Sequence, residues 1–86
     1  MRAVSAVARI ARVLLAHPDG QPVALSNAAL ARLARTTDRN VRRCISQLRD
    51  EGALSLRKST QYDRESGHRL LIPHHEVLLK VLDGEA

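Results

Sequence analysis

The sequence predicts a mainly α-helical domain with one small β-hairpin, an α+β fold, in a single unit over residues 1–86. Apolar residues recur three and four positions apart in several segments, which is the spacing of one helix face. Near the C-terminus, a polar, turn-rich stretch separates two short segments with strand character, as in a hairpin. Because the chain has no Phe or Trp and a single Tyr, Tyr62, its core must be built from aliphatic side chains.

The first helix is predicted at residues 3–16. Val7, Ile10 and Leu14 repeat at helical spacing and can face a core. The polar stripe on the other side consists of Arg2, Ser5, Arg9 and Arg12. Pro18 cannot continue a helix, and Asp19-Gly20 favours a turn, so the helix is expected to end there. A short extended stretch follows at residues 23–25.

A second helix is predicted at residues 27–35, and a tight link joins it to a third at residues 38–51. Ser26 and Thr37 are suited to cap these helices, since a hydroxyl oxygen can accept a hydrogen bond from a free N–H group of the first turn. Asp38 follows in the first turn, where a carboxylate is favoured. Gly52 is placed to end the third helix in a left-handed conformation.

The hairpin is predicted at residues 53–72. Residues 53–57 alternate as a half-buried strand should, and the second strand places Leu70 and Ile72 on one face. Pro73 ends that strand.

A final helix is predicted at residues 76–82, and it is apolar around most of its circumference. One small domain cannot hide all of that surface. We therefore expect a homodimer in which this helix packs against a second copy through Val77, Leu78, Val81 and Leu82. The alternative is that the helix only covers one end of the core.

The third predicted helix is apolar on one side and cationic on the other. Val41, Ile45 and Leu48 can face a core. The opposite side, which must face water or a ligand, carries Arg39, Arg42, Arg43 and Ser46. An exposed helix face with arginine forks suits insertion into the DNA major groove.

The charge distribution points to the same kind of partner. The chain has 14 basic and 9 acidic residues, a net charge of +5, and the whole surplus lies between Arg32 and Arg69. A basic segment of this kind predicts a polyanionic partner, and DNA or RNA is a more common one than a membrane. The alternative is an ordinary solvated basic surface.

Other functional classes have less support. The single cysteine, Cys44, cannot form an internal disulfide and borders the apolar stripe, which predicts a core position. No apolar run reaches the length of a membrane span, so we expect a cytoplasmic, nucleoid-associated protein. The amphipathic start leaves a transit peptide as the alternative.

Neither a metal nor a catalytic site is expected. The spacing of His68, His74 and His75 fits no zinc-finger pattern. The sequence shows no paired carboxylates, no Ser/His/Asp arrangement and no glycine-rich phosphate loop. We therefore expect a non-enzyme without cofactor or small-molecule ligand.

The order of these elements resembles the winged helix-turn-helix proteins over roughly residues 4–73. The residues that carry the resemblance are Thr37, Asn40, Val41, Arg43, Ile45, Leu48 and Gly52-Ala53-Leu54. They are similar to the recognition helix of bacterial winged-helix regulators, and the alanine-rich segment 26–34 also matches. Residues 25–71 are similar to the DNA-binding region of some plasmid replication initiators as well.

This resemblance implies sequence-specific binding of double-stranded DNA by a small transcription regulator. Two alternatives remain open at this point: the DNA-binding module of a replication initiator, and a winged helix used as a protein-interaction or scaffold domain.

The resemblance also implies roles for individual residues. The third helix would lie in the major groove, with base contacts from Arg39, Asn40 and Arg43. Helix starts would hold phosphate, and the hairpin, or wing, would touch the phosphate backbone or the minor groove. The implied phosphate contacts are Ser26, Asn27, Thr37, Arg42, Arg57, Lys58, Thr60, Gln61, Tyr62, Arg64 and Arg69. Asp63 and Glu65 in the same loop would repel phosphate, which argues against close contact by the wing tip.

Overall fold

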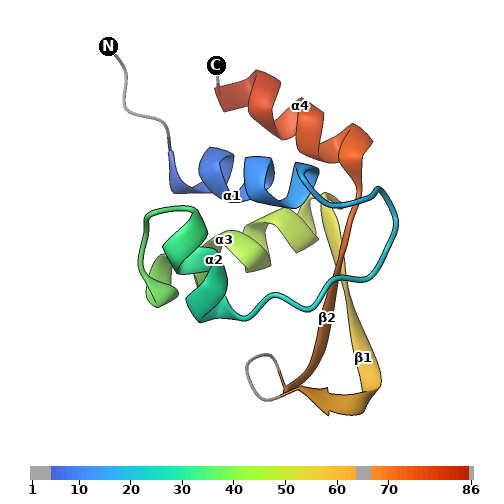
Figure 1. Ribbon diagram of the computed structural model, residues 1–86. Helices are drawn as coiled ribbons and strands as arrows, with labels where there is room; N and C mark the ends of the chain where they lie inside the picture. Colours follow the sequence, from blue (N-terminus) through green and yellow to red (C-terminus); the bar gives the residue numbers. More distant parts are fainter. Residues whose placement is uncertain (1–4, 64–66, 86) are drawn as a thin grey trace.

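The computed structural model describes residues 5–63 and 67–85, without the side chains of residues 59–63, 67, 68 and 85. The described residues form α1 (Ala6–Leu15), α2 (Asn27–Leu33), α3 (Asp38–Asp50), β1 (Leu54–Asp63), β2 (Gly67–Pro73) and α4 (His75–Glu85). The two antiparallel strands form a hairpin that projects from one end of the helices (Figure 1). The predicted fold class, mainly α with one hairpin, is confirmed.

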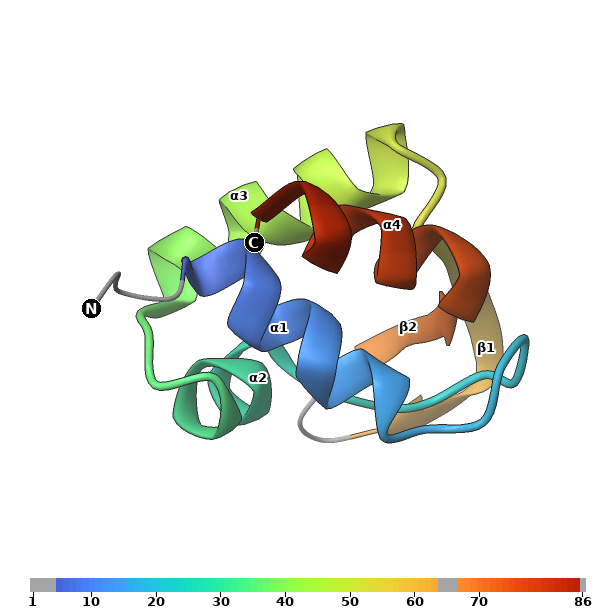
Figure 2. The ribbon, with the colours of Figure 1, turned by 90° about the horizontal axis from the view of Figure 1, so that it is seen from above.

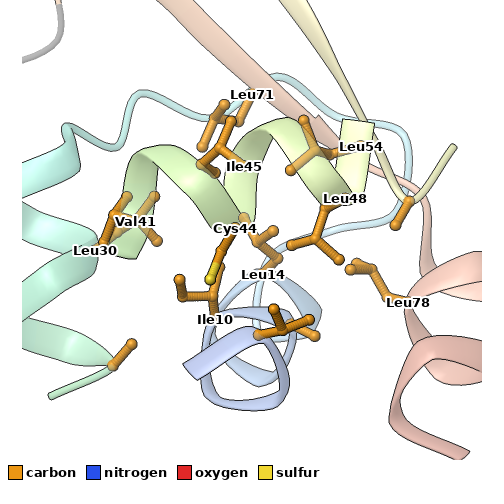
Figure 3. Close-up of a cluster of buried hydrophobic side chains, with 14 of the residues drawn as sticks. Ile10, Leu14, Leu30, Val41, Cys44, Ile45, Leu48, Leu54, Leu71 and Leu78 are labelled. Atoms are coloured by element: carbon orange, nitrogen blue, oxygen red, sulfur yellow. The ribbon is translucent and has the colours of Figure 1, made fainter. Parts of the chain in front are cut away.

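Helix α1 is the centre of the helical part. It contacts α2, α3 and α4, and the view from above shows α4 lying beside it (Figure 2). The core between the helices is aliphatic, as the composition predicts. Its completely buried side chains include Ile10, Leu14, Leu30, Val41, Leu48, Leu71 and Leu78 (Figure 3). Cys44 is 1% exposed and points toward Ile10 and Leu14, which confirms its predicted core position.

The first three helices each begin at a capping hydroxyl. Ser5, Ser26 and Thr37 accept hydrogen bonds from the N–H group three residues further on, at 3.1, 3.0 and 3.2 Å respectively. Ser5 has extended backbone angles, so α1 begins at Ala6 and not at residue 3, and Ser5 is a cap rather than part of a polar stripe. The other residues expected at the start of this helix, 3 and 4, lie outside the described residues.

Several other boundaries differ from the prediction. Helix α2 ends two residues earlier and α3 one residue earlier, whereas α4 continues through Asp83 and Gly84, which were expected to form a tail. The extended stretch predicted at residues 23–25 is reduced to a single bridge, in which Val23 and Leu71 exchange two backbone hydrogen bonds of 2.7 and 2.9 Å.

The register of the hairpin decides which strand face is buried. Leu56 lies opposite Leu71, and Arg57 lies opposite Leu70. Leu70 and Ile72 do share a face, but the face that meets the core is the other one, where Leu71 is completely buried near Ile45 of α3 (Figure 3). Because β2 is apolar at successive positions, its sequence could not indicate this choice.

Candidate nucleic-acid interface

Helix α3 presents two opposite faces. Its inward face is buried and consists of Val41, Cys44, Ile45 and Leu48. Its outward face carries the predicted cationic stripe, and the exposed side chains there are Arg39, Arg42, Arg43, Ser46 and Arg49. The fold therefore places a row of guanidinium groups on an open surface, opposite the side that holds the helix in the domain.

The outward face is not uniform. At about 100° per residue, Arg39 and Arg43 lie opposite the core, and Arg42 and Arg49 share one flank. The other flank carries Gln47 and Glu51, which line a groove against α4 together with Val77, Lys80, Val81 and Gly84. The positive charge of α3 therefore lies at its N-terminal half and on the flank away from α4.

Asn40 connects the start of α3 to its arginines. Its Nδ2 donates to the Thr36 hydroxyl at 3.0 Å, and its Oδ1 accepts from Nη2 of Arg43 at 3.3 Å. Both ends of the amide thus have partners within the protein, and Asn40 is half-buried. Each end of the amide can make a second hydrogen bond, so these contacts leave capacity for a base, and the bond to Oδ1 also orients Arg43.

The link between α2 and α3 contains an unusual backbone conformation. Arg35 has φ 54°, in the left-handed region that favours glycine. The N–H groups of Arg35 and Thr36 donate to the carbonyls of Arg32 and Ala31, which is the Schellman arrangement of a helix end. This closed link fixes the angle at which α3 leaves α2. The sequence did not predict this left-handed conformation, because arginine gives no signal for it.

The predicted phosphate contacts at the start of α2 face the protein. The Ser26 hydroxyl is buried and caps the helix. Oδ1 of Asn27 accepts a hydrogen bond of 2.6 Å from Nη1 of Arg69, whose Nη2 donates to the carbonyl of Leu25. Burial lowers the pKa of Arg69 from its ordinary value, because desolvation disfavours the charged form. A phosphate contact by these three side chains stays a prediction that the geometry does not favour.

The wing contributes two exposed basic side chains to the described surface. Arg57 and Lys58 follow each other on β1, opposite Leu70 and Arg69 respectively, and they point to opposite faces of the hairpin. The side chains of the other predicted wing contacts, Thr60, Gln61, Tyr62 and Arg64, lie outside the described residues, as do those of Asp63 and Glu65.

The predicted dimer surface on α4 is divided. Leu78 is completely buried inside the domain, so the expectation that it contacts a second copy is not supported by its position. Val77, Val81 and Leu82 are half-buried against the core. The most exposed apolar side chain of this helix is Leu79, at 53%, which was not among the predicted contacts.

Two other features are absent from the described residues. None of the described helices has the length and apolar character needed to cross a membrane. Among the side chains that the structure describes, no three of His, Cys, Asp or Glu gather in a way that could hold a metal ion.

The family model of the Crp-like helix-turn-helix domain matches residues 8–78, which include most of α1, all of α2, α3 and the hairpin, and the first turn of α4. No curated protein and no solved structure matches the chain significantly.

Proposed function

Because the chain belongs to the Crp-like helix-turn-helix family of DNA-binding domains, we propose that it is a sequence-specific transcription regulator that reads the major groove with α3. One observation carries the proposal: the exposed guanidinium groups of Arg39 and Arg43 lie opposite the core, at the N-terminal half of α3. In helix-turn-helix complexes it is this half of the second helix that contacts base edges.

We assign base contact to Arg39 and Arg43, since arginine can donate two hydrogen bonds to O6 and N7 of guanine. Asn40 takes part by holding Arg43 through one arm of its guanidinium group, at 3.3 Å. The remaining N–H groups of Arg43 stay available to a base. Direct contact of Asn40 with adenine is the competing possibility within the same proposal.

We assign phosphate contact to side chains that lie beside Arg39 and Arg43. Arg42 and Arg49 are seven residues apart on one flank, or about 10 Å along the helix, which lets them follow one DNA strand. Arg57 and Lys58 of the wing and the exposed Thr37 complete the set. Asp50 and Glu51 make the C-terminal end of α3 acidic, so phosphate repulsion favours the N-terminal half as the deeper one in the groove.

We also propose that the protein acts as a homodimer through α4. The support is the exposed apolar side chain of Leu79 on α4. A twofold dimer predicts an inverted-repeat site whose half-sites are about one helical turn, or a multiple of it, apart. A location at the nucleoid follows from the DNA partner.

The test is a selection of bound sites from random duplex DNA, followed by titration of the selected site over a range of salt concentrations. We expect one enriched motif and a log-linear loss of affinity with salt, with a slope of about −0.9 for each phosphate contact. Enrichment of a motif in tandem copies would favour the replication-initiator alternative. Absence of any duplex binding at low salt would refute the proposal and leave the protein-scaffold alternative.

A further inference from the structure

Arg69 joins two segments that are far apart in the sequence. It lies on β2, and its two guanidinium arms donate to Oδ1 of Asn27 and to the carbonyl of Leu25, 42 and 44 residues earlier. We propose that Arg69 is a positioning residue that fixes the wing against the start of α2, so that the wing and α3 reach DNA together. This inference rests on the proposed DNA-binding function.

The hairpin register explains why the contact forms at this place. Val23 and Leu71 pair in antiparallel fashion through two backbone hydrogen bonds, so the same register would place Leu25 opposite Arg69. No Leu25–Arg69 backbone bridge forms, since the chain turns into the Ser26 cap of α2. The guanidinium group of Arg69 reaches the Leu25 carbonyl instead, and thereby continues the connection up to the first residue of the helix.

The contact requires the shape of arginine. One planar fork donates to a side-chain amide and to a backbone carbonyl at the same time. A lysine ammonium has the same charge but lacks the rigid fork, so it cannot reproduce both bonds in the same geometry.

The burial of Arg69 fits positioning better than phosphate contact. Its Nε is buried and, among the described residues, has no hydrogen-bond partner, and desolvation lowers its pKa. Arg69 is half-buried; a charge withdrawn from water is weak evidence for stability, and fixing one geometry is a better-attested use of such groups. Lys58 lies opposite Arg69 across the hairpin and is exposed. The hydrogen bonds of Arg69 to Leu25 and Asn27 would therefore determine where the Lys58 side chain lies relative to DNA.

The test is a set of variants on the full chain, bound to its selected DNA site over a range of salt concentrations. Arg69→Lys, Arg69→Gln and Asn27→Ala probe the connection, and Lys58→Gln removes a wing charge directly. We expect Arg69→Lys to lose about as much affinity as Arg69→Gln, since the fork and not the charge is needed. In the otherwise unchanged protein, Lys58→Gln should make the dependence of log affinity on log salt less steep, by about one in slope. In the Arg69→Gln background the same substitution should change the slope much less.

A direct phosphate contact by Arg69 would give a different pattern. Arg69→Lys would then keep most of the affinity, and the losses from Arg69→Gln and Lys58→Gln would add. That pattern would overturn the inference. A purely structural role would lower the melting temperature of Arg69→Gln and leave the effect of Lys58→Gln on the salt slope unchanged, which would overturn it as well.

A measurement without DNA separates this inference from the proposed function. If the unaltered protein binds no duplex, the proposed function fails, and amide hydrogen exchange still reports on the connection. We expect the amides of Val23 and Leu71 to exchange at least about tenfold faster in Arg69→Lys and in Asn27→Ala, because the adjacent charged hydrogen bonds are lost. Unchanged exchange at both amides would refute the positioning role.

Discussion

The Asp19 carboxylate accepts a hydrogen bond of 2.8 Å from the backbone N–H of His75, the first residue of α4, across 56 positions of sequence. The His75 ring supports the same junction, because its Nε2 lies 2.7 Å from the carbonyl of His17. The loop after α1 therefore caps the last helix. A carboxylate at a helix N-terminus satisfies a free N–H group and interacts favourably with the helix dipole.

We predict that Asp19→Ala lowers the free energy of unfolding by about 1 kcal/mol, a typical value for the loss of a cap. For a domain of this size, the melting temperature should fall by about 4–8 °C. Asp19→Asn keeps an acceptor oxygen and loses only the charge, so its effect should be smaller. Thermal unfolding followed by circular dichroism measures both. Equal melting temperatures for all three proteins would show that the cap contributes nothing.

The left-handed residue in the link between α2 and α3 gives a second prediction. Arg35 has φ 54°, and a non-glycine residue in this region is strained by about 1–2 kcal/mol. Arg35→Gly relieves the strain but makes the unfolded chain more flexible, so we expect a net stabilisation of roughly 0.5–1 kcal/mol in urea unfolding.

Gly52 provides the matched control, since it ends α3 with φ 80° in the same arrangement. An added Cβ at Gly52 meets no atom within 4 Å, so Gly52→Ala changes only the backbone preference. We expect it to destabilise the protein by about 1 kcal/mol, opposite in sign to Arg35→Gly. If the two substitutions shift stability in the same direction, the strain assigned to Arg35 is wrong.

These examples show how far the sequence could predict the fold. Local patterns were sufficient for the caps at Ser26 and Thr37, the arginine face of α3 and the core position of Cys44. They depend only on neighbouring residues along the chain, so a single sequence contains them.

Contacts that depend on register were not predictable. Arg69 appeared to be one more basic wing residue, because its bonds to Leu25 and Asn27 exist only when the hairpin lies beside the start of α2. The buried face of β2 had the same difficulty, since both of its faces are apolar. The carboxylate cap by Asp19 joins two segments that no local pattern connects.

The proposed division between base and phosphate contacts predicts two different losses of affinity. Arg43→Ala should weaken binding to the preferred site by about 1–3 kcal/mol and relax specificity at one base position. Lys58→Ala should weaken binding to all sequences about equally. It should also make the dependence of log affinity on log salt less steep, by about one in slope. Competition binding against a set of single-base variants of the selected site measures both. Equal losses for the two variants on every sequence would exclude base reading by Arg43.

Asn40→Ala tests the role assigned to Asn40 in the same assay. If Asn40 orients Arg43 through their 3.3 Å hydrogen bond, specificity should relax at the base position read by Arg43. The double variant Asn40→Ala, Arg43→Ala should then be little weaker than Arg43→Ala alone. Relaxed specificity at a separate A·T position would instead identify Asn40 as a base contact in its own right.

Helix α4 offers two neighbouring leucines that separate the domain core from the proposed dimer surface. Leu78 is completely buried, so Leu78→Ala should lower the free energy of unfolding by about 2–5 kcal/mol through the lost contacts and the cavity. Leu79 is 53% exposed, so Leu79→Glu should leave the stability of a single chain almost unchanged. In a dimer through this helix, however, it would bury a charge without a partner and drive the protein to a monomer. Light scattering at micromolar concentration should therefore give a dimer mass for the unaltered protein and a monomer mass for Leu79→Glu. A monomer mass for both would remove the dimer and, with it, the reason to expect an inverted-repeat site.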